Sequence, residues 1–303
     1  MWFVCAIITT IIWGLAELFY KKGAHPDEKY SHLKVCICVG LVMGIHAIFV
    51  LLTKNIDYDF INIIKYFPVS FFYILAMALS FFGMRFLEES ISDPIENTSG
   101  AIAAILCFIF LKQSIGWLSF LGIFLIILGV FYIGMTEAKD ENGRKKKYGK
   151  KLAIIAFIMP FLYAIFDGIG SFLDAYFLEI ETSPLVNISE DNIELVANTS
   201  YELTFAICAL ILFIFITLRK ERLNILNQKD KMLAAVCETA GQFTYVFAMS
   251  GSAVIAAPII SSVCAFSVIF SRIFLKEKLT KKQYIAIITI ITGIIILGVA
   301  EEL

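Results

Sequence analysis

Charged residues are scarce in this chain of 303 residues, where Asp, Glu, Lys and Arg together make up 17%, against roughly 25% in ordinary soluble domains. Hydrophobic residues make up 59%, and the mean hydropathy is +0.84. A soluble protein of this size could not bury so much apolar surface. The composition therefore excludes a soluble globular protein and predicts a membrane protein that crosses the bilayer several times.

Other absences narrow the function. The net charge of −1 lacks the basic excess of nucleic-acid-binding proteins, so no nucleic-acid partner is expected. The seven Cys lie in apolar stretches without a CxxC pair, and the three His form no cluster with them. We therefore expect no zinc site and no disulfide framework. The absence of a Ser/His/Asp pattern or a Gly-rich phosphate loop disfavours an enzyme.

The apolar residues form runs long enough to cross a membrane as helices, which requires roughly 20 residues each. The runs lack the alternation typical of a transmembrane β-barrel. We predict an all-α membrane protein with ten transmembrane helices. Because the sequence has no basic n-region before its first apolar run and no A-x-A site within the first 25 residues, we expect no cleaved signal peptide. The expected spans are residues 2–20, 33–53, 66–87, 91–111, 117–136, 152–178, 198–218, 231–249, 252–275 and 283–300.

Two longer connections suggest how the chain is divided. Residues 137–151 are strongly basic and separate five spans from five, whereas residues 179–197 are acidic and contain neither Lys nor Arg. We therefore predict a first five-helix repeat at residues 1–136, a basic linker at 137–151 and a second five-helix repeat at 152–303.

A sequence repeat supports this division. The segment IFLK at residues 109–112 recurs at residues 273–276, and with the same offset Pro94 falls on Pro258. Because each repeat contains an odd number of helices, the second copy must enter the membrane from the opposite side. This arrangement predicts an inverted repeat, the construction of many transporters, with a binding site at the interface between the halves.

These features resemble the drug/metabolite transporter superfamily, and within it the ten-helix EamA-type transporters. The resemblance is carried by a Trp-Gly pair at residues 13–14, a Lys pair at 21–22 and the helix–turn–helix unit that ends each half. That unit reads FLKQSIGWLSFLGIFLIILGV in the first half and FLKEKLTKKQYIAIITIITGIIILGV in the second. In the turns, Lys276 replaces the Gly that is usual in the family, and Gln113 replaces a Glu.

The resemblance implies a transporter of small solutes that works by alternating access, without enzymatic activity or a bound cofactor. It implies that the first, third, fourth, sixth, eighth and ninth helices line a central cavity and that the fifth and tenth lie at the periphery. The expected partners are a small-molecule substrate and the lipid bilayer. The oligomeric state stays open, with a homodimer as one option.

Carboxylates at membrane depth are candidate functional groups, because placing a charge there costs at least roughly 2.5–3.5 kcal/mol. Glu17 lies one helical turn after Trp13, and aligning Trp13 with Tyr163 places Glu17 on Asp167. We predict that the two carboxylates face one cavity from opposing halves and bind a proton or a cationic solute beside an aromatic wall of Trp13 and Tyr163. The alternatives are an interfacial position for Glu17, near Lys21, and a helix-packing role for Asp167.

Two further places combine polar residues with apolar helices. Glu238, Gln242 and Tyr245 are spaced to form one polar stripe, which either lines a cavity or joins helices by hydrogen bonds. Cavity lining is favoured, because a carboxylate is a costly group for packing alone. Ser261 follows Pro258, where small polar residues either meet a ligand or pack closely.

The junction between the third and fourth spans is acidic, whereas its counterpart at residues 251–258 has no charge. We expect Asp93, Glu96 and Asn97 to face a cavity mouth that would suit a cationic or amine-bearing solute. The alternative is that these residues only begin the fourth helix. The predicted substrate-binding set is Trp13, Glu17, Asp93, Glu96, Asn97, Tyr163, Asp167, Glu238, Gln242, Tyr245 and Ser261.

The basic residues lie mainly on one side of the expected topology. Alternate connections hold 22 of the 25 Lys and Arg residues, and the positive-inside rule places that side in the cytoplasm and both termini outside. The resembled family has cytoplasmic termini instead, so the orientation stays open. We expect a multi-pass protein of the plasma membrane.

Two functions remain in competition. The first is a secondary transporter that moves a small metabolite or drug-like solute by alternating access, with proton coupling as an option. The second is a non-transporting binding or regulatory subunit built on the same fold. Carboxylates on three separate membrane helices, at Glu17, Asp167 and Glu238, favour transport.

Overall fold

The computed structural model describes residues 1–23, 28–54, 56–83, 85–86, 95–113, 115–137, 150–221, 223–224, 227–274 and 280–302. Over these residues the chain folds into helices and contains no strand. Helices suit such apolar runs because they pair every backbone polar group within the segment. The all-α fold class is therefore confirmed over the part of the chain that the structure describes.

A helical segment occupies each of the ten predicted spans. In chain order the helices are α1 (Trp2–Gly23), α2 (Ser31–Thr53), α3 (Ile61–Lys65), α4 (Phe67–Gly83), α6 (Ser99–Leu106), the π-helical turn η1 (Cys107–Leu111), α7 (Trp117–Glu137), α9 (Lys150–Phe177), α10 (Ile193–Leu218), α11 (Lys229–Ile260), α12 (Val263–Phe274) and α13 (Lys281–Glu302). Six of them, α1, α2, α9, α10, α11 and α13, are long and apolar enough to cross a membrane. Four shorter apolar segments, at residues 67–83, 99–111, 117–132 and 263–274, complete the set.

Some boundaries differ from the prediction. Helix α10 begins at Ile193 instead of residue 198, and Glu194 in its first turn is favourably placed beside the positive end of the helix dipole. The third span ends early, at Gly83. Much of the predicted basic linker lies outside the described residues, so the division into repeats stays a prediction.

The chain reverses direction within α11. Thr9 donates a hydrogen bond to the Gly241 carbonyl (3.3 Å), and the neighbouring Thr10 donates one to the Ile259 carbonyl (3.4 Å). A straight helix would hold these two carbonyls about 27 Å apart, at 1.5 Å per residue. The backbone leaves the helical conformation at Ser252 (φ −155°, ψ 83°), which lies at the predicted boundary between the eighth and ninth spans. A second break, at residues 261–262 before α12, was not predicted.

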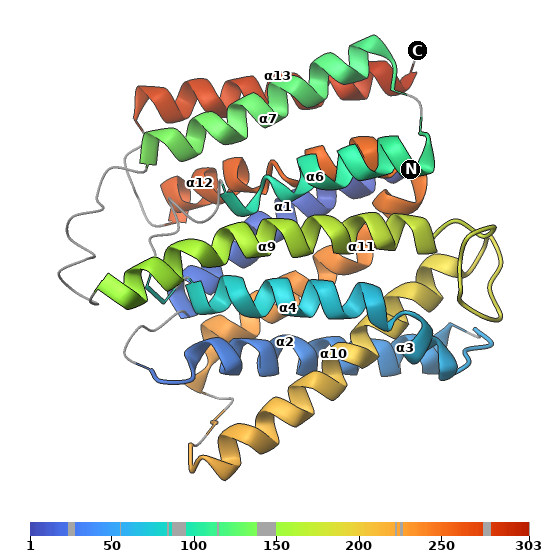
Figure 1. Ribbon diagram of the computed structural model, residues 1–303, viewed down its shortest axis with the longest axis vertical. Coiled ribbons are helices and arrows are strands. Elements are labelled where there is room, and N and C mark those ends of the chain that lie inside the picture. The colour runs from blue at the N-terminus through green and yellow to red at the C-terminus, as the bar shows by residue number, and fades with distance from the viewer. Residues whose placement is uncertain are drawn as a thin grey trace.

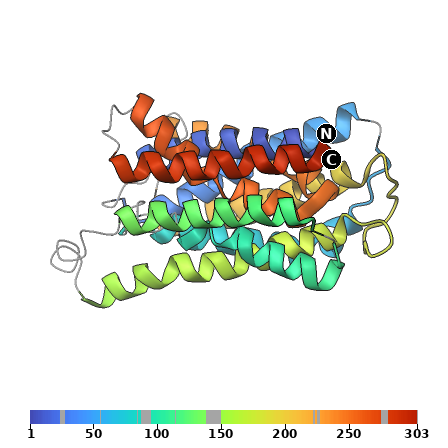
Figure 2. The same ribbon diagram turned by 90° about the horizontal axis from the view of Figure 1, so that it is seen from above.

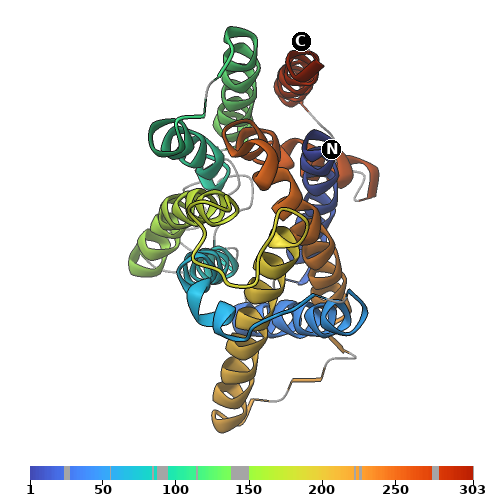
Figure 3. The ribbon, with the colours of Figure 1, turned by 90° about the vertical axis from the view of Figure 1, so that its right-hand side faces the viewer.

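Both termini lie at the same end of the bundle as the 178–192 connection (Figures 1 and 2). Helices α7 and α13 stand side by side at one edge, and α10 reaches the opposite edge (Figure 3). The α7–α13 pair packs closely, and glycines permit this approach. A Cβ at Gly129 would lie 2.5 Å from the Ile290 side chain, and a Cβ at Gly293 would lie 2.8 Å from the Gly122 carbonyl oxygen. These two helices therefore lie at the periphery, as the resemblance implies for the fifth and tenth.

Helices α2 and α10 cross at Gly40. A Cβ at this position would lie 2.5 Å from both the Ala209 Cβ and the Phe205 carbonyl oxygen. We predict that Gly40→Ala forces the two helices apart and destabilises the protein by roughly 1–3 kcal/mol, as overpacking typically does. A lower melting temperature in detergent would show this. Gly116→Ala is the matched control, since its nearest neighbour atom would lie at 3.9 Å, and equal melting temperatures for the two variants would contradict the prediction.

Candidate functional site

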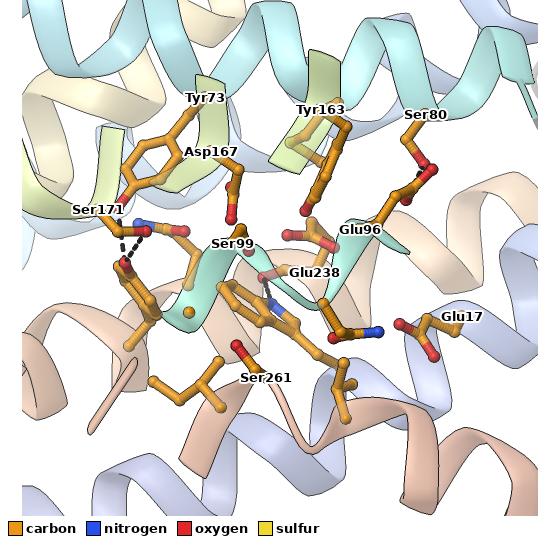
Figure 4. A pocket seen from close by; sticks show the side chains of 18 of the residues that line it. Glu17, Tyr73, Ser80, Glu96, Ser99, Tyr163, Asp167, Ser171, Glu238 and Ser261 are labelled. Carbon is orange, nitrogen blue, oxygen red and sulfur yellow. Dashed lines mark hydrogen bonds between the residues drawn. The ribbon is translucent and has the colours of Figure 1, made fainter. Parts of the chain in front are cut away.

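A cavity of about 130 Å³ lies in the middle of the bundle, among α1, α4, α6, α9, α10, α11 and α12 (Figure 4). All but one of the predicted site residues line it: Trp13, Glu17, Glu96, Asn97, Tyr163, Asp167, Glu238, Gln242, Tyr245 and Ser261. The exception, Asp93, lies outside the described residues. The lining helices are those implied by the family resemblance, with Tyr201 of α10 in addition.

Four carboxylates share this lining: Glu17, Glu96, Asp167 and Glu238. Glu96 accepts a hydrogen bond from the Ser80 hydroxyl (2.7 Å), and Glu238 accepts one from the Tyr20 hydroxyl (3.2 Å). Among the described lining residues there is no Lys, Arg or His. The lining therefore gathers four acidic side chains around one space, which favours a positively charged occupant.

An aromatic wall stands beside the carboxylates. The rings of Trp13 and Tyr245 stack with centroids 5.2 Å apart, and the indole nitrogen donates a hydrogen bond to the Glu238 carbonyl (3.2 Å). Gly241 makes room for this indole, because a Cβ there would lie 2.3 Å from the ring. Trp13, Tyr245 and Tyr163 give the cavity aromatic faces of the kind that attract organic cations.

The Asp167 carboxylate points toward the middle of the cavity, which Ser99 of α6 and Tyr163 of α9 also line (Figure 4). Glu17 reaches the same cavity from α1, near the end where α4 contributes Ser80 (Figure 4). Glu17 and Asp167 thus come from the two predicted halves, as the repeat alignment suggests.

Buried hydroxyl groups close one end of the cavity. Tyr73 and Tyr245 are hydrogen-bonded through their hydroxyls (2.6 Å), and the Tyr245 hydroxyl oxygen lies 3.0 Å from that of Ser171. Beyond them, the buried Asp174 accepts hydrogen bonds from Tyr66 and, at 3.5 Å, from Tyr73. We call these five residues the tyrosine cluster. It joins α4 to α9 and α11, and so joins the first predicted half to the second.

An ion cluster ties the two predicted halves together near the start of α11. Glu28, in the α1–α2 connection, pairs with Lys34 of α2 (2.5 Å) and Lys231 of α11 (2.9 Å), and its carbonyl accepts a hydrogen bond from Arg85 (2.8 Å). Partial burial raises the pKa of Glu28, but the hydrogen bonds and charges of the two lysines outweigh it and lower the pKa to about 2.

One intramembrane carboxylate was missed by the sequence analysis and lies outside the cavity lining. Glu202 of α10 is fully buried, where His46 Nδ1 of α2 lies 2.8 Å from both its oxygens and Asn198 donates a hydrogen bond at 3.0 Å. This carboxylate has a titratable partner that can carry a positive charge. Because it lies outside the cavity lining, Glu202 serves as an internal comparison for the four carboxylates there.

Sequence reasoning also missed several neutral lining residues, among them Tyr73, Ser80, Ser99 and Tyr201. Uncharged hydroxyls cost little in a membrane helix, so their presence alone does not mark a site. A spacing of seven residues between Tyr73 and Ser80 places them on one helix face, and that periodicity was the available signal.

Comparisons with known proteins are consistent with this architecture. The model of the EamA-like transporter family matches residues 1–135 and 182–299. A Methanocaldococcus jannaschii protein named Uncharacterized protein MJ1333.1 is 32% identical over 150 residues, which are 48% of this chain and 98% of that protein. A solved structure described as "Crystal structure of protein" superposes with a TM-score of 0.67 at 11% identity, covering 98% of this chain and 96% of that one. At this identity the likeness concerns the fold alone.

The low pKa of Glu28 has a consequence for stability. Because the pKa falls from its ordinary 4.5 to about 2, the carboxylate stabilises the fold above about pH 4.5, and this contribution is lost as the pH falls toward 2. We predict that Glu28→Gln lowers the melting temperature at pH 7 by several degrees and that the difference from the wild type shrinks on acidification. The exposed Glu190, changed to Gln, is the control, and a difference that does not depend on pH would contradict the assignment.

Proposed function

The chain belongs to the EamA-like transporter family, and on that premise we propose that it exchanges a small organic cation for protons by alternating access. It is a multi-pass membrane transporter of the drug/metabolite kind. The proposal concerns what passes through it and how the movement is driven.

One observation carries the choice of substrate. Four carboxylates and an aromatic wall surround one cavity, and no cationic side chain lies among its described lining residues. An anionic solute would meet only repulsion there. An ammonium group can pair with a carboxylate and lie against the rings of Trp13 and Tyr163, so an amine of modest size is the solute that fits.

Proton coupling follows from the same groups. A carboxylate held away from water is stabilised either by a bound proton or by a paired cation. If proton and solute compete for Asp167 and Glu238, binding of one releases the other, and the two move in opposite directions. This competition needs no communication between distant sites.

The two ends of the cavity offer the parts that alternating access requires. We propose that residues 1–136 and 152–303 form two inverted five-helix halves that rock against each other. The tyrosine cluster joins these halves at one end, and the Glu28–Lys231 ion pair joins them at the other. Breaking one set while the other stays intact would open the cavity to one side at a time.

We predict that Asp167→Asn abolishes uptake driven by a pH gradient. The amide keeps the shape of the side chain, but it cannot ionise or carry a proton. The assay is uptake of radiolabelled tetramethylammonium or phenethylamine into proteoliposomes that are acidic inside. Wild-type vesicles should accumulate label, and the variant should fall to the level of empty vesicles.

Glu202→Gln is the matched control, because it neutralises another carboxylate of a membrane helix, one that is buried and lies outside the cavity. It should keep gradient-driven uptake. The proposal is wrong if Asp167→Asn and the wild type accumulate label equally. It is also wrong if the wild type moves no cation, as the alternative of a non-transporting subunit requires.

A further inference from the structure

A second hollow, of about 250 Å³, lies between α6, α7 and the end of α11. Its walls are almost entirely apolar, with Ala101 on α6 and Phe124, Leu128 and Phe131 on α7. The three α7 side chains are about half exposed at the surface of the bundle, where the solvent is lipid. Nothing in the proposed exchange of cation for proton uses this space.

The hollow adjoins the carboxylate cavity. Asn97 and Ser261 line both spaces. Gly100 lets α6 approach the end of α11 at this place. A Cβ at Gly100 would lie 1.8 Å from the Ser261 hydroxyl oxygen and 2.5 Å from the Ala257 carbonyl oxygen. Helices α6 and α11 are therefore in direct contact at Gly100, and beside this contact the two spaces share the small polar side chains of Asn97 and Ser261.

We infer that the apolar hollow receives the hydrophobic arm of the transported cation, so that the substrate class is an amphipathic amine. Its ammonium group would lie among the carboxylates and its alkyl or aryl arm would extend past Asn97 and Ser261 toward α7. This inference rests on the proposed function and adds the second half of the substrate.

Size and chemistry support this occupant. An engineered apolar cavity of roughly 150 Å³ binds benzene, so 250 Å³ holds an aromatic ring or a short alkyl chain. Each methylene moved from water into such a space contributes roughly 0.8 kcal/mol, which corresponds to a three- to fourfold gain in affinity. A hydroxyl at the end of the arm would find no hydrogen-bonding partner on the α7 wall and would reverse that gain.

The experiment compares permanently charged ions that share one head and differ in one arm. Tetramethylammonium, butyltrimethylammonium and hexyltrimethylammonium compete with radiolabelled tetramethylammonium for uptake into proteoliposomes. For the wild type, the inhibition constant should fall roughly threefold for each added methylene until the hollow is full. In Ala101→Leu, which adds bulk to the hollow without touching the carboxylate cavity, that dependence should flatten while tetramethylammonium uptake persists.

Two further variants supply a second test of the hollow and a control. Leu128→Trp fills the hollow from the opposite wall, so a folding defect in one variant does not decide the outcome. Ile288→Trp, on the lipid-exposed face of α13 and outside the hollow, is the control and should keep the wild-type dependence on chain length. The control also accounts for the partitioning of longer ions into the bilayer, because that effect is the same for every variant.

The outcomes separate the inference from the function on which it rests. If tetramethylammonium is transported but chain length has the same effect in wild type, Ala101→Leu and Leu128→Trp, the hollow does not hold the arm and belongs to a lipid chain instead. If the terminal hydroxyl of a hydroxyhexyl analogue causes no loss of affinity, the inference also fails. If the wild type takes up no tetramethylammonium, the proposed function fails and the inference fails with it.

Discussion

The burial of carboxylates within a lipid-surrounded bundle is the constraint on which this structure depends. A charge at membrane depth must be neutralised or paired, and the protein does this in two ways. Glu202 is held by His46 and Asn198, a local arrangement that links α2 to α10. In the cavity, Glu238 and Glu96 accept hydrogen bonds from the neutral hydroxyl groups of Tyr20 and Ser80.

These hydroxyl contacts support the interpretation of the cavity as a binding site. Hydroxyl groups can bond a carboxylate or its protonated acid, so the described lining accommodates both states without rearrangement. A pairing with Lys or Arg would fix the ionised state and fill the space. Lys34 and Lys231 pair with Glu28 at one end of the bundle, where the Lys231–Glu28 pair joins the predicted halves.

Much of this could be predicted from the sequence, for physical reasons. Apolar runs of sufficient length allow few structures other than helices, and a carboxylate inside such a run is costly enough to mark a site. For this reason Glu17, Asp167 and Glu238 were found without coordinates. The reversal near Ser252 was also predicted, because a continuous helix through both apolar runs would be too long for one crossing.

The remaining features of the cavity and the hollow depend on how the helices pack against one another, which cannot be predicted from a single sequence. In the sequence, Tyr73 and Tyr201 resemble ordinary helix residues. They line the cavity because of the way α4 and α10 are oriented in the bundle. The apolar hollow lies where α6, α7 and the end of α11 meet, close to the break at residues 261–262. Such features arise from how separate elements meet.

The central claim is that a cation and a proton compete for the same buried carboxylates. The most direct measurement is the number of protons released when tetramethylammonium binds to the purified protein in weakly buffered detergent solution. The account predicts that binding acidifies the solution and that the apparent affinity for the cation weakens as the pH falls. Binding with no proton release at any pH between about 5 and about 9, the range in which perturbed carboxyl groups titrate, would contradict it.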